Sequence, residues 1–227
     1  MTTISDVHGV KAVVFDAFGT LAHIGEKRHP YRHLLQKLAA HGRRPQADDA
    51  SRIMSANVGI AGIAGLFGVE FPASEIAGIE IELYEELASV KLFPDALPVL
   101  GALRTAGYKL ALCSNLAAPY AIPLKLLLPP LDVYVWSFET GAVKPEPAIY
   151  EALFDRLECS PFETMMVGDT LESDYTGPRR LGMRSCHLAR DTESPVAENV
   201  RTLYEVLDLL RQPRHENLRN ESAMNDA

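Results

Sequence analysis

The sequence predicts a Rossmann-like α/β fold, in which helices cover both faces of a parallel sheet. Short apolar runs alternate along the chain with longer stretches of helical periodicity. The runs are almost continuously apolar, which is typical of parallel strands buried on both faces. They cover residues 10–15, 108–113, 132–136, 164–168 and 184–188. Ligands of such sheets bind beyond the carboxyl ends of the strands, so we expect the functional site there.

The stretches between and after these strands are predicted to be helices, at residues 95–106, 117–128, 146–157, 174–182 and 199–211. Residues that end helices stand where several of these should stop, namely Gly107, Gly182 and the pair Pro129-Pro130. Glycine adopts the left-handed conformation that closes many helices, and proline cannot continue one.

The alternation is interrupted between the first two predicted strands. No convincing strand is predicted from Leu21 to Pro94, and segments such as HPYRHLLQKLAAHG and ASEIAGIEIELYEELASV have helical periodicity. We therefore expect a core domain of residues 1–21 and 95–211 and an inserted helical domain of residues 22–94. Residues 212–227 are polar and aperiodic, which predicts a disordered tail.

Four glycines recur every three residues inside the insertion, at Gly59, Gly62, Gly65 and Gly68. Such a repeat can form a phosphate-binding loop, or it can allow close packing of helices. No strand precedes it and no Gly-Lys-Ser/Thr follows it, so the pattern favours helix packing or a bent segment.

Composition excludes several classes of protein. The chain has 227 residues, 47% of them hydrophobic, and a formal net charge of −8, so it offers no basic surface for nucleic acid or anionic membranes. Its N-terminus lacks a signal peptide, and no apolar run approaches about 18 residues. Its three scattered cysteines predict neither disulfides nor a zinc site. We expect a soluble, cytoplasmic protein.

Chemically useful side chains follow four of the predicted strands. Each has an ordinary structural explanation by itself, as a helix cap, a turn or a solvated lysine. Their order is more informative, because the carboxyl ends of parallel strands meet at one edge of the sheet. The sequence therefore predicts one site formed by Asp16, Ser114, Asn115, Lys144, Asp169 and Asp174.

These residue types favour phosphoryl chemistry. Three converging carboxylates repel one another unless a cation lies among them, and ligands that are all oxygen select a hard ion such as Mg²⁺. A carboxylate nucleophile would split hydrolysis into two steps through an aspartyl intermediate. A small anionic substrate is expected, and the predicted substrate-binding residues are Ser114, Asn115 and Lys144.

Four segments, FDAFGTL, CSN, KPEPAIY and VGDTLESDYTGPRRLGM, resemble the four motifs of the haloacid dehalogenase-like (HAD) hydrolase superfamily. The resemblance covers about residues 10–188, and the insertion resembles the family's type-1 α-helical cap. It implies Asp16 as nucleophile, Lys144 as stabilising cation, and Thr20 and Ser114 as contacts to the phosphate or leaving group. The Mg²⁺ ligands it implies are Asp16, Asp169, Asp174 and the backbone carbonyl of Phe18.

Phe18 departs from the pattern of the family's phosphatases, which usually carry aspartate as general acid and base two residues after the nucleophile. Loss of such a group typically slows a reaction by about 10²–10⁴-fold. A phosphatase with Phe18 should favour leaving groups that need no proton, or take an acid from elsewhere. His23 is one candidate acid, and packing against the insertion is its alternative role.

Because of this aromatic residue, three functions stay open: a phosphatase, a dehalogenase and a ligand-binding protein. The family's 2-haloacid dehalogenases also carry an aromatic residue there, and Tyr150 agrees weakly with that class. The pair Gly168-Asp169 has instead the metal-binding form of the phosphatases. A dehalogenase also needs a cap arginine as halide acceptor, for which Arg43, Arg44 and Arg52 are candidates. A ligand-binding homologue with little turnover is the third possibility. The oligomeric state stays open.

Overall fold

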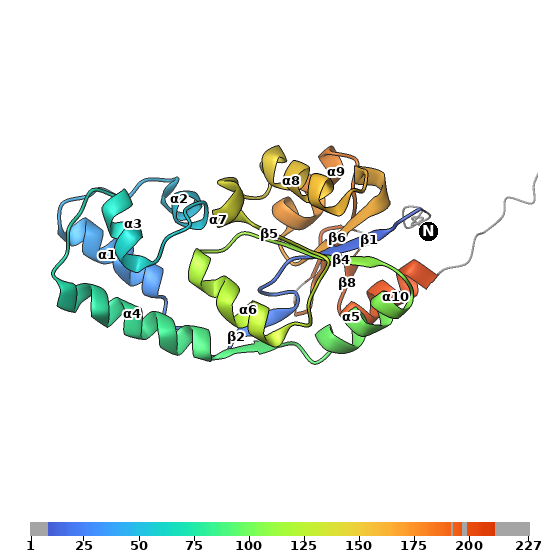
Figure 1. Ribbon diagram of the computed structural model, residues 1–227, viewed down its shortest axis with the longest axis horizontal. Helices are drawn as coiled ribbons and strands as arrows, with labels where there is room; N and C mark the ends of the chain where they lie inside the picture. Colours follow the sequence, from blue (N-terminus) through green and yellow to red (C-terminus); the bar gives the residue numbers. More distant parts are fainter. Residues whose placement is uncertain (1–8, 192, 197–198, 212–227) are drawn as a thin grey trace, which may run out of the picture.

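The computed structural model describes residues 9–191, 193–196 and 199–211. This part of the chain contains a six-stranded sheet of parallel strands in the order β5-β4-β1-β6-β7-β8 (Figure 1). The strands are β1 (Ala12–Phe15), β4 (Lys109–Ser114), β5 (Val133–Trp136), β6 (Thr164–Gly168), β7 (Arg184–Leu188) and β8 (Asn199–Val200). All five predicted strands are confirmed, and β8 is an addition.

Strand β1 lies at the point where the order of the sheet reverses. The chain first adds β4 and β5 on one side of β1 and later adds β6, β7 and β8 on the other. Ala12 is accordingly paired with Lys109 of β4 and with Thr164 of β6. Ligands of open parallel sheets bind at such reversal points, beyond the carboxyl ends of the strands. Asp16 directly follows β1 and therefore stands at this position.

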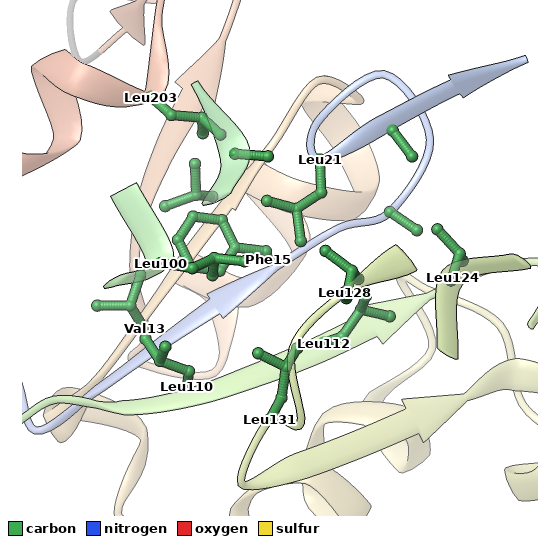
Figure 2. Packing of buried hydrophobic residues seen from close by; sticks show 14 of the residues in the cluster. Val13, Phe15, Leu21, Leu100, Leu110, Leu112, Leu124, Leu128, Leu131 and Leu203 are labelled. Carbon is green, nitrogen blue, oxygen red and sulfur yellow. The ribbon is translucent and has the colours of Figure 1, made fainter. Parts of the chain in front are cut away.

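Both faces of the sheet are buried, as the apolar strands predicted. Val13 and Phe15 pack on one face in a cluster that includes Leu100 and Leu203 (Figure 2). Ala12 and Val14 belong to a second cluster on the other face. Successive side chains of a strand point to opposite faces, so a strand in the middle of such a sheet has to be apolar throughout.

Helices pack on both faces of this sheet. In the described residues they are α5 (Ala96–Thr105), α6 (Ala121–Leu127), α7 (Ser137–Thr140), α8 (Pro147–Leu157), α9 (Gly177–Arg180) and α10 (Leu203–Arg211). Two predicted helices begin differently: a 3₁₀ turn (Ala118–Tyr120) precedes α6, and a π-helical segment (Leu171–Thr176) precedes α9. Residues 199–200 form β8 rather than a helix start, and the short α7 was not predicted. The predicted tail at 212–227 lies outside the described residues.

The insertion forms a separate helical layer beside the sheet (Figure 1). It contains α1 (Pro30–Ala40), α2 (Asp49–Met54), α3 (Ile60–Leu66) and α4 (Ala73–Ala88), which share their own apolar cluster. Gly62 and Gly65 lie in α3, Gly59 precedes this helix, and Gly68 follows it with a φ of +73°. All four glycines are exposed, and a Cβ at Gly59, Gly65 or Gly68 would meet no heavy atom within 4 Å. The helix-packing interpretation is therefore wrong, and the segment forms a short helix followed by a left-handed turn at Gly68. We call this layer the cap. None of the described helices combines the length and the apolar character needed to span a bilayer.

The prediction that no strand occurs between Leu21 and Pro94 is wrong. Two short strands, β2 (Ala22–Ile24) and β3 (Val90–Leu92), pair antiparallel where the chain enters and leaves the cap. Each has three residues, too few to produce a periodic pattern. Their pairing joins segments far apart in the sequence, so only tertiary structure brings them together.

Candidate active site

Lys144 is the centre of the site. Its ammonium donates to Asp16 Oδ1 at 2.8 Å, to Asp174 Oδ1 at 2.6 Å and to the carbonyl of Cys113 at 2.7 Å. The residue is only 3% exposed, so all three donors are used inside the protein. Burial opposes the charge of the lysine, but the two neighbouring carboxylates outweigh that effect and raise its pKa. Lys144 is therefore a permanent positive charge beside Asp16.

Asp16 is buried at the carboxyl end of β1, where its backbone N–H donates to the carbonyl of Val167 at 3.0 Å. Burial raises the pKa of Asp16 to about 6, with Asp174 adding to the rise, while Lys144 and a hydrogen bond from Ser114 act in the opposite direction. The carboxylate is thus held in an environment that makes it reactive while its charged form is retained near neutral pH.

Asp169 completes a group of three carboxylates. One oxygen from each of Asp16, Asp169 and Asp174 lies within 4.8 Å of the others. Desolvation and the charge of Asp16 raise the pKa of Asp169, although this side chain reaches the surface. Carboxylate oxygens that crowd together in this way suit a hard divalent cation. The donor set fits Mg²⁺, because the described site offers oxygen ligands and no cysteine or histidine among them.

Two glycines make room for these carboxylates. Gly19 has a φ of +90°, and a Cβ at this position would overlap the carboxylate of Asp169. A Cβ on Gly168, the last residue of β6, would overlap Asp174 in the same way. Asp174 is fully buried and uses its second oxygen to accept from the backbone N–H of Thr170 at 2.9 Å. Both of its oxygens are therefore engaged by protein groups.

Asn115 holds the backbone of the lysine. Its amide nitrogen donates to the carbonyl of Lys144 at 2.7 Å, and its amide oxygen accepts from the N–H of Lys144 at 2.7 Å. Both ends of the amide are used, so the structure gives Asn115 a positioning contact with Lys144. Ser114, at the end of β4, is buried next to Asp16.

Thr20 is completely buried, and its hydroxyl has no hydrogen-bond partner within the described residues. Its carbonyl accepts from Arg190 at 2.8 Å, and the same guanidinium pairs with both oxygens of Asp95 at 2.9 Å each. Arg190 therefore ties the loop after Asp16 to the start of α5. This contact was not predicted, although Arg190 closely follows a predicted strand at the functional edge.

His187 is a second residue that was not predicted. Its Nε2 donates to the carbonyl of Asp169 at 3.0 Å, and its Nδ1 is hydrogen-bonded to the hydroxyl of Ser194 at 2.7 Å. It lies in β7 beside the Gly168 end of β6. The signal in the sequence was a histidine near the carboxyl end of a predicted strand, at the edge where the site was expected.

A cavity of about 420 Å³ opens between this site and the cap. It is largely apolar and begins at Phe18 and Asn115. Its other lining residues come from β2, α1, α2 and the segment after β4: Ile24, Tyr31, Arg32, Leu35, Ala50, Ile53, Met54, Leu116, Ala117 and Tyr120. The ring of Phe18 meets that of Tyr120 edge to face, with centroids 5.8 Å apart.

The arginine that lines this cavity is Arg32, which was not among the predicted candidates. Arg43 pairs with Asp49 and stacks on Phe67, and Arg52 stacks on the same ring. Arg44 is exposed. None of the three candidate halide acceptors therefore lines the cavity. Two of them are bound by neighbouring side chains within the cap.

His23 and Tyr150 have packing contacts. The ring of His23, in β2, lies 5.0 Å from that of Phe93, and the residue is not part of the cavity lining. The hydroxyl of Tyr150 donates to the carbonyl of Ser173 at 2.5 Å, beside Gly177. Tyr150 therefore supports the segment that carries Asp174.

Residues 10–182 match a family model described as haloacid dehalogenase-like hydrolase. The chain belongs to this family. The HAD-like hydrolases it resembles include phosphatases and dehalogenases. Membership and the observed sheet with its helical cap confirm the resemblance, the fold class and the assignment as a hydrolase.

Three similar HAD-like proteins illustrate the range of activities among these relatives. A glyceraldehyde 3-phosphate phosphatase of Methanopyrus kandleri is 32% identical over 126 residues, which are 52% of this chain and 53% of the relative. The (S)-2-haloacid dehalogenase 1 of a Pseudomonas species is 26% identical over 80% of this chain and 85% of its own. A HAD phosphatase of Thermococcus onnurineus superposes with a TM-score of 0.62 at 27% identity, covering 89% of this chain and 98% of its own. This chain matches about half the length of the first phosphatase relatives.

Proposed function

We propose that this HAD-like hydrolase is a Mg²⁺-dependent phosphohydrolase that acts on a small phosphorylated metabolite. The observation that carries the proposal is the arrangement of Lys144 between Asp16 and Asp174, with an oxygen of Asp169 within 4.8 Å of theirs. A permanent cation keeps the nucleophile charged, and the carboxylates of Asp16 and Asp169 offer oxygen ligands for a hard ion.

In the first step, an oxygen of Asp16 attacks the phosphorus of the substrate. A bond forms between that oxygen and phosphorus, while the bond between phosphorus and the ester oxygen breaks and its electron pair leaves with the oxygen. Lys144 keeps Asp16 deprotonated and oriented for this attack. The hydroxyl of Ser114, which donates to Asp16, would turn from this carboxylate to a phosphoryl oxygen.

In the second step, a water oxygen attacks the phosphorus of the aspartyl phosphate. The bond to Asp16 breaks and the carboxylate is restored. One proton of the water stays on the released phosphate, and the other neutralises the departed oxygen through solvent. Phe18 cannot assist either transfer, because its side chain has no ionisable group.

The predicted metal ligands are Asp16, Asp169, Asp174 and the carbonyl of Phe18. Because Lys144 and the Thr170 amide engage both oxygens of Asp174, its part would be to support the other ligands. When bound, Mg²⁺ would neutralise charge on the nucleophile and the phosphoryl group together.

The decisive experiment replaces Asp16 by asparagine and measures hydrolysis of acetyl phosphate and 4-nitrophenyl phosphate with Mg²⁺. We expect activity to fall by at least about 10³-fold, because an amide forms no aspartyl phosphate. Circular dichroism would verify that the variant is folded. Full Mg²⁺-dependent activity of a folded Asp16→Asn protein would refute the role of Asp16 as the nucleophile.

A 2-haloacid dehalogenase is the second candidate function, and two residues that line the cavity favour it. Phe18 supplies an aromatic surface, and Arg32 supplies a cationic group at the same cavity. Halide leaves without a proton, so the missing acid is no obstacle to this reaction. Chloride release from 2-chloropropionate in the presence of a chelator would support it, and no release would eliminate it. A chain that hydrolyses neither substrate class would instead be the ligand-binding homologue.

A further inference from the structure

Two features of the site belong together: the absence of an acid at Phe18 and the apolar cavity that starts there. Eight of the twelve lining residues are aliphatic residues, methionine or phenylalanine, and they come from the cap and from the core alike. A volume of about 420 Å³ is within the range of small-molecule sites. Whatever occupies this cavity is therefore in contact with carbon rather than with charge over most of its surface.

The polar groups of the cavity are mostly engaged elsewhere. The hydroxyl of Tyr120 donates to Glu86 at 2.5 Å, and the amide of Asn115 is used by the backbone of Lys144. The hydroxyl of Tyr31 is buried and has no hydrogen-bond partner in the part of the chain that the structure describes. The cavity therefore offers few free polar groups to a ligand, which suits a ligand with an apolar body.

The leaving group must suit Phe18. Without an acid in place, the ester oxygen departs as an anion, and the stability of that anion decides the rate. A phenol ionises near pH 10, as tyrosine does, whereas water, to which an alcohol is similar, ionises only near 16. An aromatic hydroxyl compound is therefore a leaving group that needs no acid and that also has an apolar body.

We propose that the substrates are aryl phosphates, with the aromatic ring of the leaving group bound in the cavity beside Phe18. This inference rests on the proposed phosphohydrolase function and adds the substrate class. The ring would lie against the side chains of α1 and α2. The cap contributes most of the cavity lining, so it selects the leaving group while the core holds the phosphate.

The test separates leaving-group acidity from apolar contact. Acetyl phosphate has the more acidic leaving group but no ring, whereas phenyl and 1-naphthyl phosphate have rings and less acidic leaving groups. If the ring is bound, KM for both aryl phosphates should be at least about tenfold lower than KM for acetyl phosphate, given the apolar area removed from water. A lower KM for acetyl phosphate would overturn the inference.

A cavity variant tests where the aromatic ring of the substrate binds. Ala50 is exposed on α2 and lines the cavity, so Ala50→Phe should fill it without disturbing the core. We expect kcat/KM for 1-naphthyl phosphate to fall at least about tenfold more than kcat/KM for acetyl phosphate. Ala39→Phe, on an exposed position of α1 outside the cavity, is the matched control and should change neither. Equal losses for the two substrates would place the ring elsewhere.

Inhibition gives a readout that does not depend on turnover. Phenylphosphonate should inhibit at least about tenfold more tightly than methylphosphonate, and Ala50→Phe should remove that difference. Asp16-dependent hydrolysis of acetyl phosphate without preference for aryl compounds would refute only the substrate class. Failure to hydrolyse any of these phosphates would refute the proposed function and this inference together.

Discussion

Phe18 sets the chemical limits of the site at the scale of a single residue. It is half-buried, its ring contacts Tyr120, and it stands two positions after the proposed nucleophile. An apolar ring at this point excludes acid catalysis from the nucleophile loop and gives the cavity its apolar wall. One residue thus affects both the reaction rate and the choice of substrate.

Replacing Phe18 by aspartate should restore a positioned acid. The rate for alkyl phosphates should then rise by about tenfold or more, because alkoxides need a proton to leave, while aryl phosphates should gain little or lose the apolar wall. Hydrolysis of glycerol phosphate and phenyl phosphate by wild type and Phe18→Asp gives the comparison. Equal gains on both substrates would contradict the leaving-group argument.

Gly19 is a second residue with a local requirement, since a Cβ there would overlap the carboxylate of Asp169. Gly19→Ala should displace Asp169 and weaken Mg²⁺ binding by about 10–100-fold, as other changes around metal ligands do. The Mg²⁺ concentration at half-maximal activity measures the effect.

Gly107→Ala is the matched control. Gly107 has nearly the same φ, +88° against +90° for Gly19, but a Cβ at this position would meet no heavy atom within 4 Å beyond its chain neighbours. The variant therefore reproduces the strain of a left-handed alanine without the contact to Asp169. A similar loss of Mg²⁺ affinity in both variants would contradict the role of Gly19.

At the scale of elements, Glu86 of α4 connects the cap to the core. Its carboxylate accepts from the backbone N–H groups of Arg28 at 2.5 Å and His29 at 2.8 Å, at the start of α1. It also accepts from the hydroxyl of Tyr120 in the core at 2.5 Å. The side chain of His29 makes no capping bond, so Glu86 supplies the acceptor and the negative charge that a helix start favours.

Glu86→Gln should lower the free energy of unfolding by about 1–3 kcal/mol, because a buried acceptor loses its charge and gains N–H donors that lack partners. Urea unfolding of the wild type and of the variant measures this change in the free energy of unfolding. Glu85→Gln is the control, since Glu85 pairs with Arg28 on the surface and such pairs contribute about 0–1 kcal/mol. An equal or larger loss in the Glu85 variant would show that Glu86 has no special role.

At the scale of the whole molecule, cap and core meet at few polar contacts within the described residues. Besides the bond from Tyr120 to Glu86, the hydroxyl of Ser137 in α7 donates to the carbonyl of Met54 in α2 at 2.6 Å. The cavity beside Phe18 lies between the two parts and takes lining residues from both. The position of the cap therefore determines the shape of the proposed leaving-group site.

Metal binding should be visible in the stability of the whole protein. A ligand at 100 times its Kd stabilises the native state by about 2.7 kcal/mol, which corresponds to several degrees in Tm for a chain of this size. Millimolar Mg²⁺ should therefore raise the Tm of the wild type and leave that of Asp169→Asn unchanged. Glu172→Gln removes an exposed carboxylate paired with Arg180 and should keep the shift. An unshifted wild type would contradict the metal site.

Much of the fold followed from local patterns. The runs ending at Phe15 and Gly168 were predicted correctly because a strand buried on both faces is continuously apolar. The strands β2 and β3 were not, since three residues carry no periodicity. The π-helical segment before α9, which carries the buried Asp174, was also missed, because such short segments have no periodic pattern of their own.

The sequence by itself determined the strand ends, and with them the convergence of Asp16, Lys144 and Asp169 at one edge of the sheet. Only the tertiary structure decided that Asn115 binds the backbone of Lys144, that Arg190 holds the loop of Thr20, and that an apolar cavity lies beside Phe18. The physical reason is the distance along the sequence over which each kind of interaction acts. Strand and helix patterns depend on neighbours in the chain, whereas a side chain's partners depend on which distant segments the packing brings into contact.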